Sequence, residues 1–291
     1  MTDQMKAQHP HAGHPGAGHP GAGHPGGHPG VAPKGQPGAP GYDAEGNRLG
    51  KAVQTAEGWH SLHTVYRIDF YLWNQFDDQE KREALDELKA FVVKLEEGHQ
   101  AGTSSYAFYD VVGHKGDLMF WFLRPSLEEL NDVELEFRKL KIASVLENTY
   151  SFTSVTELSM YLTSKMEGPE VKQKLYPHVP RNKYMCFYPM SKSRNLEDNW
   201  YMLPARERGM LMKSHGELGK TYLSVMSEFT TGACGLDVHE WGITLLGDDD
   251  IQFKKIVYDM RFEEASARYG IFGDFYVGTI ITDDRLEKIF G

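Results

Sequence analysis

The chain has 291 residues, a formal net charge of −10 at pH 7 and an aromatic content of 12%. This length is sufficient for one sizeable core or for two smaller ones. The acidic balance argues against nucleic acid as a partner, because phosphate binding requires a basic face. The two cysteines, Cys186 and Cys234, indicate neither a disulfide framework nor a close metal-binding pair. The start, MTDQMKAQHP, contains no apolar leader segment, and no later stretch reaches membrane-spanning length, which predicts a soluble, cytoplasmic protein.

Residues 1–50 form a low-complexity tail in which the unit AGHPG recurs. The tail contains almost no large apolar side chains, so it cannot bury enough surface to offset chain entropy, and we expect it to be disordered. Its histidines could gather zinc, nickel or copper in a weak, adaptable site, which leaves a metal-buffering protein as one hypothesis and a solvated tail as the other. These histidines are His9, His11, His14, His19, His24 and His28.

The first half of the remaining chain predicts the order β-α-β-β-α-β. A helix over residues 77–97 is indicated by the helical spacing of Leu85, Leu88, Val92 and Leu95. The other predicted elements are strands over His63–Trp73, 106–113, 117–124 and Tyr150–Tyr161, and a helix that begins at Ser126 with Glu129 completing a capping box.

The second half repeats this order. Its predicted elements are strands over 183–190, 228–235, 240–247 and 274–281, and helices over 204–223 and 251–270. Internal duplication of this kind predicts an α+β fold made of two tandem ferredoxin-like units, the dimeric α+β barrel type, whose sheets pack face to face with helices outside. We place the units at residues 51–165 and 183–291, with a linker over residues 166–182.

The stretch from Tyr184 to Gly219 carries the clearest chemistry. It begins as a strand that contains Tyr188, and Pro189 is expected to end the strand because proline removes a backbone donor. The helix that follows carries His215, with Gly216 and Gly219 on one face. A flat ligand could approach the backbone there, and a neutral imidazole is a common axial ligand of haem iron. Alternatively, His215 has only a structural role. In that case His178 and His239 are the next candidates for the iron ligand.

Several strings in this part of the chain occur in order: FYPMSKSR, NWYMLPARER, KSHGELG, EWGITL, MRFEEASARYG and FGDFYVG. Together they resemble the coproheme decarboxylases, a branch of the chlorite dismutase superfamily. The resemblance runs from about His60 to the C-terminus and is densest after Tyr184. It implies an enzyme of haem biosynthesis that uses hydrogen peroxide to convert two propionates of Fe-coproporphyrin III (coproheme) to vinyl groups, giving haem b.

The resemblance also implies roles for individual residues. His215 is similar to the proximal iron ligand, and Tyr188 to the redox-active tyrosine, with Lys192 as its catalytic companion. The residues implied in binding the porphyrin or its propionates are Lys174, Tyr188, Pro189, Met190, Ser191, Lys192, Glu228, Arg261 and Ser266. A site with several cations and donors around an apolar slot suits a substrate with four propionates.

Two positions depart from the family pattern. Lys174 stands where relatives usually carry arginine, so the charge is kept but the bidentate fork is lost. Glu228 stands where the decarboxylases commonly have glutamine and the chlorite-degrading relatives have arginine. A carboxylate there argues against chlorite chemistry and could act as a base toward peroxide.

The resemblance further implies a homo-oligomer, usually a ring of five, and coproporphyrin ferrochelatase as a transient partner. Two other functions remain open at this point. One is a chlorite dismutase-like haem enzyme. The other is a non-catalytic haem-binding or carrier protein, in which Tyr188 would be dispensable.

Overall fold

The computed structural model describes residues 52–159 and 168–291, so the predicted tail lies outside the described residues. The strands are β1 (Thr55–Ile68), β2 (Ser105–Val111), β3 (Leu118–Arg124), β4 (Leu146–Ser159), β5 (Tyr184–Lys192), β6 (Met226–Gly232), β7 (Trp241–Gly247), β8 (Gly270–Phe272) and β9 (Tyr276–Ile280). The α-helices are α1 (Phe70–Trp73), α2 (Asp78–Gln100), α3 (Leu127–Arg138), α4 (Pro169–Leu175), α5 (Ala205–Lys220), α6 (Ile251–Met260), α7 (Glu264–Ala267) and α8 (Asp283–Phe290), and 3-10 turns cover Lys141–Val145 and Trp200–Met202.

The strands form one antiparallel sheet in the order β7-β6-β4-β1-β3-β2-β9-β5-β8, and β7 also pairs with β5. This last pairing closes eight strands into a barrel. Within the barrel, the runs β4-β1-β3-β2 and β9-β5-β7-β6 repeat the strand order of a ferredoxin-like unit. The predicted α+β fold of two tandem units is therefore confirmed. We call these runs the first sheet and the second sheet.

The two sheets meet through both their inner faces and their edges. Strand β2 pairs with β9 at one seam, and β4 pairs with β6 at the other through only two residue pairs, Val155–Gly232 and Thr156–Thr231. The barrel interior is filled by large side chains of both sheets, including Trp121, Phe152 and Phe187. Face-to-face packing was expected, but a closed barrel additionally satisfies the edge strands.

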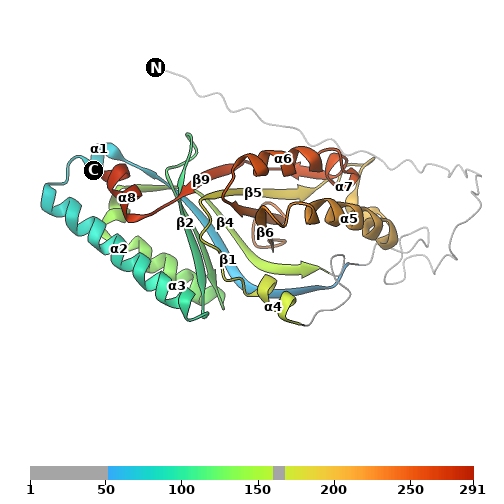
Figure 1. Cartoon of the computed structure of the whole chain (residues 1–291), viewed down its shortest axis with the longest axis horizontal. Coiled ribbons are helices and arrows are strands. Elements are labelled where there is room, and N and C mark those ends of the chain that lie inside the picture. Colours follow the sequence, from blue (N-terminus) through green and yellow to red (C-terminus); the bar gives the residue numbers. More distant parts are fainter. Residues whose placement is uncertain (1–51, 160–167) are drawn as a thin grey trace, which may run out of the picture. The chain divides into compact units, whose positions relative to one another are not determined.

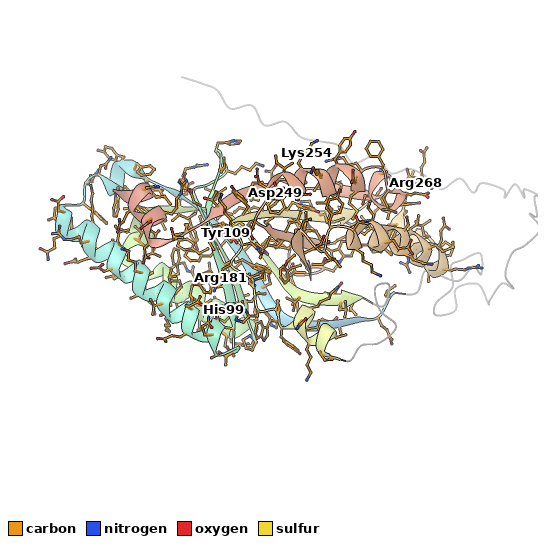
Figure 2. All side chains as sticks on the ribbon, in the orientation of Figure 1. His99, Tyr109, Arg181, Asp249, Lys254 and Arg268 are labelled. Carbon is orange, nitrogen blue, oxygen red and sulfur yellow. The ribbon has the colours of Figure 1, made fainter. Side chains whose placement is uncertain are left out.

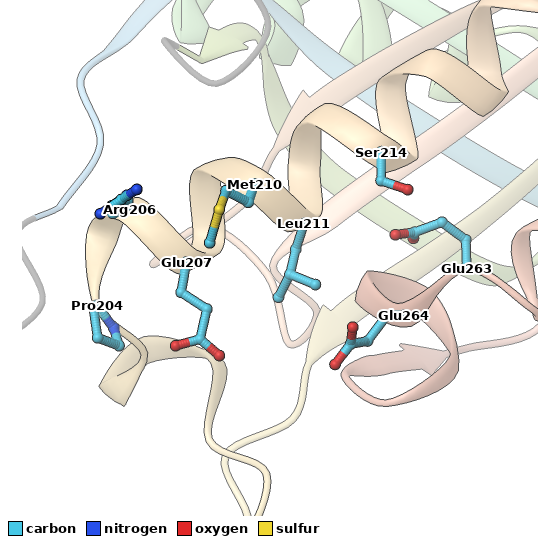
Figure 3. Close-up of a pocket in the computed structure, with 8 residues that line it drawn as sticks. All are labelled: Pro204, Arg206, Glu207, Met210, Leu211, Ser214, Glu263 and Glu264. Atoms are coloured by element: carbon cyan, nitrogen blue, oxygen red, sulfur yellow. The ribbon is translucent and has the colours of Figure 1, made fainter. Parts of the chain in front are cut away.

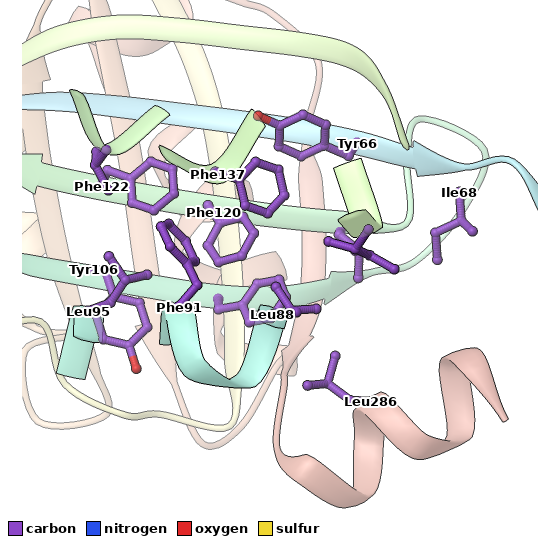
Figure 4. Close-up of a cluster of buried hydrophobic side chains, with 14 of the residues drawn as sticks. Tyr66, Ile68, Leu88, Phe91, Leu95, Tyr106, Phe120, Phe122, Phe137 and Leu286 are labelled. Carbon is purple, nitrogen blue, oxygen red and sulfur yellow. The ribbon is translucent and has the colours of Figure 1, made fainter. Parts of the chain in front are cut away.

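The helices cover the outside of the barrel, with α2 and α3 over the first sheet and α5, α6 and α7 over the second (Figure 1). The core under α2 and α3 is rich in phenylalanine (Figure 4). In that core, the rings of Phe108 and Phe120 stack with 3.9 Å between centroids. Asp77 and Glu80 form a capping box at the start of α2, and Ser126 caps α3 by accepting a hydrogen bond from the Glu129 amide.

The prediction of one strand as far as Trp73 is wrong beyond Ile68. Asp69 accepts a hydrogen bond from the Leu72 amide and caps the short helix α1, which turns Trp73 into the core. The Trp73 indole donates to the carbonyl of Phe290, 3.0 Å away, in the C-terminal helix α8. Helix α8 was not predicted, and its apolar residues pack into the core of the first unit.

The prediction that Pro189 ends its strand is also wrong, because β5 continues to Lys192. Strand β9 pairs with β5 as far as Phe187, and β8 takes over from Met190, so Pro189 lies at the break between them. Its carbonyl accepts a hydrogen bond from the Gly273 amide on that side. In an antiparallel strand, a residue's N–H and C=O point the same way, so the missing donor of Pro189 faces the break and removes no ladder hydrogen bond.

Two other predictions are refined. The helix expected over residues 251–270 is interrupted after Met260, because Glu263 caps a separate helix, α7, by accepting from the amides of Ala265 and Ser266. The expected linker over residues 166–182 contains helix α4, whose Val171 and Leu175 pack against Leu158 of β4. The boundaries at 51–165 and 183–291 stay a prediction.

Both cysteines are free thiols, as expected. Among the helices of the described residues, none is long and apolar enough to cross a membrane.

Candidate functional site

The outer face of the second sheet forms one wall of the candidate site. Tyr188 of β5 lies opposite Ile243 of β7, which in turn lies opposite Thr230 of β6. Two residues away along each strand, and therefore on the same face, Leu245 of β7 lies between Cys186 of β5 and Glu228 of β6. Residues directly opposite one another point to the same side of a sheet, so Tyr188 and Glu228 share this face and are two strands, or about 10 Å, apart across it.

Helix α5 faces this wall and brings His215 to it. Near the C-terminal end of the helix, Leu218 packs against the apolar residues of the wall, and so does Tyr222, which lies just beyond the helix. At Gly219, one turn beyond His215, an added Cβ would lie 3.9 Å from the Glu228 carboxylate and 3.5 Å from Met260. The helix therefore approaches the sheet closely at the turn that follows the candidate ligand.

The imidazole of His215 is oriented by two neighbours on α7. Its Nδ1 lies 3.1 Å from Oε2 of Glu263 and 3.3 Å from Oγ of Ser266. Glu263 is itself buried and fixed, because it accepts hydrogen bonds from the amides of Ala265 and Ser266. A carboxylate that accepts from Nδ1–H leaves the lone pair on Nε2, the arrangement found in most histidine–metal sites.

Glu263 was missed by sequence reasoning, although it stands in the string MRFEEASARYG. An acidic residue at the N-cap of a four-residue helix gives only a weak local signal. Ser266 is predicted to bind a propionate, which stays a prediction, and the structure places its hydroxyl 3.3 Å from Nδ1 of the His215 ring.

Tyr188 lies on the wall with its ring held by aromatic neighbours. The rings of Tyr188 and Phe275 stack with 4.5 Å between centroids, and Phe272 lies 5.9 Å away. Within the described residues, no hydrogen bond engages the Tyr188 hydroxyl. Burial raises the pKa of this phenol well above its usual value, and the negative charge of Glu228 raises it further. The hydroxyl therefore keeps its hydrogen at neutral pH.

Glu228 connects these groups electrostatically. Solvent reaches its side chain, but the surrounding protein strips enough hydration from the carboxyl group to raise its pKa. The positive charge of Lys174 acts in the opposite direction on the same group, and so does that of His215 when the imidazole is protonated. His215, Lys174 and Tyr188 thus lie within electrostatic range of the Glu228 carboxylate, although they come from three different elements.

The remaining predicted residues on β5 divide between the two faces of the strand. Met190 packs with the apolar residues of the wall, whereas Ser191 alternates to the opposite face. There the Ser191 hydroxyl lies 3.2 Å from Nδ1 of His239 and accepts from the Glu240 amide. Ser191 is thus not brought together with Tyr188 and His215.

Lys192 is buried beneath α7 and does not point into open space. Its Nζ donates to the carbonyl of Ala265, 2.7 Å away, and lies 4.7 Å from the centre of the Trp200 ring. Burial lowers the pKa of Lys192 to about 8, while the charges of Glu263 and Glu240 raise it. Lys192 therefore supports the helix that carries Glu263.

Of the cations predicted for the site, two are exposed in the part of the chain that the structure describes. Lys174 is an exposed residue of α4, and Arg261 is an exposed residue that follows α6. The Arg261 guanidinium lies 5.2 Å from the centre of the Phe272 ring, beside Tyr188. Both can bind anions near the wall.

A cavity of about 620 Å³ lies between α5 and α7, with Glu263 in its lining (Figure 3). Tyr188, Glu228 and His215 are not among its lining residues, so it connects to the candidate site through Glu263, which contacts Nδ1 of His215. Its lining residues are Pro204, Arg206, Glu207, Met210, Leu211, Ser214, Glu263 and Glu264.

The other candidate histidines lie elsewhere. The His178 ring packs against His99 with 3.6 Å between centroids, and His239 contacts Ser191. No group of three or more His, Cys, Asp or Glu suited to a metal ion occurs in the described part of the chain.

Residues 81–281 match the family model described as chlorite dismutase, and the protein belongs to this family. Similar proteins include the coproheme decarboxylase of Staphylococcus saprophyticus, which is 46% identical over 82% of this chain and 98% of the relative. That of Staphylococcus carnosus is 43% identical over 83% of this chain and 99% of the relative.

Two solved structures are similar to this protein to different degrees. A haem-binding protein from Thermus thermophilus is 45% identical, with a TM-score of 0.81 over 84% of this chain and 99% of that one. Chlorite dismutase from Candidatus Nitrospira defluvii, in complex with imidazole, is 19% identical, with a TM-score of 0.66 over 81% of this chain and 96% of that one. The latter likeness concerns the fold alone.

Proposed function

We propose that this protein is a coproheme decarboxylase that uses hydrogen peroxide to convert two propionates of Fe-coproporphyrin III to vinyl groups, giving haem b. The observation that carries the proposal is the joint placement of a carboxylate-oriented histidine and an unengaged, neutral phenol around one wall. The relatives of this chain that are named coproheme decarboxylases support the same substrate.

The residues fit this substrate in kind. Nε2 of His215 would hold the iron, and the apolar wall would contact one face of the flat ring. Lys174 and Arg261 would bind propionates, and the Tyr188 hydroxyl would donate to a third. Lys192 and Ser266 would act indirectly, through Glu263 and His215.

Each turnover removes two electrons from one propionate: R–CH2–CH2–COO− + H2O2 + H+ gives R–CH=CH2 + CO2 + 2 H2O. The iron porphyrin, together with peroxide, supplies the oxidising power. Tyr188 would give the hydrogen atom of its hydroxyl to the iron porphyrin that peroxide has oxidised, and would take one from the β-carbon of the propionate. The second electron would pass to the same oxidant as CO2 departs. The raised pKa of Tyr188 serves this step because an ionised phenol has no hydrogen to exchange. Glu228 can take up and return the peroxide proton at its carboxylate.

The alternatives fit less well. Chlorite degradation needs a cation for an anionic oxidant, and the position expected to supply it holds the carboxylate of Glu228. A carrier would not need the Tyr188 hydroxyl.

We also propose that the protein is cytoplasmic and forms a homo-oligomer, a ring of five by resemblance. In this proposal it receives coproheme in transient contact with the ferrochelatase.

The test is to load the protein with Fe-coproporphyrin III and titrate it with hydrogen peroxide while following the porphyrin mass. We expect stepwise loss of two carboxyl groups. His215→Ala should shift the absorption spectrum of the bound porphyrin, and His239→Ala should not. An unchanged porphyrin mass would contradict the decarboxylase, and an unchanged His215→Ala spectrum would contradict the ligand.

A further inference from the structure

Tyr188 belongs to the second unit, but one of the contacts that fix its ring begins in the first. The loop between β2 and β3 carries Lys115, whose ammonium donates to the carbonyl of Phe275, 2.7 Å away. It also lies 3.7 Å from the Asp274 carboxylate. Phe275 is the residue whose ring stacks on Tyr188. We propose that Lys115 is a positioning residue for Tyr188 and acts through Phe275.

The loop that carries Lys115 is itself held firmly. The Lys115 carbonyl accepts from the hydroxyl of Thr149, 2.8 Å away on β4. The next residue, Gly116, packs so closely that an added Cβ would lie 2.3 Å from the Val65 side chain. Asp117 accepts from the Ile68 amide at 2.7 Å. Lys115 therefore extends from a fixed base.

The corner that receives Lys115 connects β8 to β9 and wraps around the strand residue next to Tyr188. The Gly273 amide donates to the Pro189 carbonyl at 2.8 Å, and an added Cβ at Gly273 would lie 2.7 Å from the Pro189 ring. Phe275 lies just before β9, outside the strand ladder, so its carbonyl takes its hydrogen bond from the lysine. Removal of the ammonium would leave that carbonyl without this partner and free the corner to shift.

The proposal rests on the proposed function for its consequence, because a hydrogen-atom transfer depends on the position of the Tyr188 ring. A displacement of about 1 Å can cost about 10²-fold in rate. A loop from the first unit would then set the catalytic geometry of the second. This role differs from propionate binding, since among the described residues the Lys115 ammonium contacts the corner and the neighbouring ring of Tyr276 on β9.

The first readout uses the protein without porphyrin. Fluorotyrosine placed at position 188 should give one fluorine NMR resonance, shifted by the stacked ring of Phe275. Lys115→Met should move this resonance or split it. Phe275→Leu should also change it, because it removes the ring that stacks on Tyr188. Lys115→Arg, which keeps a donor, should restore the parent signal. Lys94→Met is the matched control, because it removes a lysine from an exposed ion pair with Glu136.

The second readout uses the porphyrin-loaded protein. In Lys115→Met, kcat for decarboxylation should fall about tenfold or more, while the Kd for Fe-coproporphyrin III stays within about twofold. A parent-like resonance in Lys115→Met would overturn the proposal, whatever Phe275→Leu shows. Weaker binding of Fe-coproporphyrin III by Lys115→Met, together with a parent-like resonance, would also overturn it, since Lys115 would then act on the substrate. If the parent protein itself fails to decarboxylate, the proposed function falls, and the NMR series still decides whether Lys115 positions Tyr188.

Discussion

The two ferredoxin-like units share one topology but differ in how their helices meet their sheets. In the first unit, α2 buries Ala84, Leu88, Phe91, Leu95 and His99, and the sheet opposes it with a cluster of phenylalanines. In the second unit, Arg208 is the buried residue of α5, and the sheet presents Tyr188 and Glu228. The same fold thus forms a closed core in one unit and a lined site in the other.

The difference follows from the side chains on the covering helix. Helix α2 carries large apolar residues at helical spacing, so close packing against the sheet is favourable. Helix α5 carries glycines and polar residues on the corresponding turns, so it contacts the sheet mainly near its C-terminal end. The candidate site thus lies in the unit whose covering helix contributes fewer buried apolar residues to the core.

The largest effect is expected for Tyr188→Phe. This change keeps the ring and its stacking on Phe275 but removes the hydroxyl. Turnover should fall on the order of 10³-fold, whereas the Kd for coproheme should stay nearly constant, because the hydroxyl hydrogen is used only in the reaction. Product mass and a binding titration on the same variant measure both quantities. Full activity of the variant would mean that Tyr188 has only a packing role, like the core phenylalanines of the first unit.

A matched pair of truncations compares the two helix–sheet contacts directly. Phe120→Ala should lower the free energy of unfolding by about 3–5 kcal/mol, because it opens a hole in a fully buried core. Leu218→Ala on the half-buried face of α5 should cost only about 1 kcal/mol. Urea unfolding at neutral pH measures both. Equal costs would mean that the second unit is packed as tightly as the first.

A third test addresses the polar contact at which the first unit holds the segment before β5. His99, at the end of α2, lies beside Arg181 (Figure 2), and its Nδ1 is 2.9 Å from the Ser105 hydroxyl, which also accepts from the Val179 amide. Burial lowers the pKa of His99 to about 4, and the charges of Arg181 and His178 lower it too.

Because the unfolded chain has the higher pKa for this histidine, it binds more protons between about pH 6.5 and pH 4. Stability from His99 is therefore fully present above that range and is lost as the pH falls through it. Between pH 7 and pH 5 the parent should lose about 2 kcal/mol more than His99→Gln. Urea unfolding at the two pH values measures this difference, and equal losses would exclude the histidine.

The smallest effect is expected outside both units. Removal of residues 1–50 should leave decarboxylation within about twofold, because a segment without a core adds little to a preorganised site. A lost turnover in a truncated protein that still unfolds cooperatively would mean that the tail delivers metal or substrate.

Much of the fold was predictable from local patterns. Periodic apolar residues identified α2, and the repeated β-α-β-β-α-β order identified the two units. Three of the errors occurred where a polar side chain capped a short helix, at Asp69 and Glu263, or where a break in a neighbouring strand made room for Pro189. Such events depend on contacts between segments that the local sequence does not contain.

By itself, the sequence determined the residue types of the site: a histidine beside glycines, a tyrosine on a strand, and a carboxylate at position 228. Only the tertiary structure decided their partners. In that structure, Glu263 contacts Nδ1 of His215, and the Lys192 ammonium is buried against the carbonyl of Ala265. Ser191 lies on the opposite face of β5 from Tyr188, beside His239. The physical reason is that hydrogen-bond partners and strand register are set by packing between distant segments, whereas periodicity along one segment reports only which face of it is apolar.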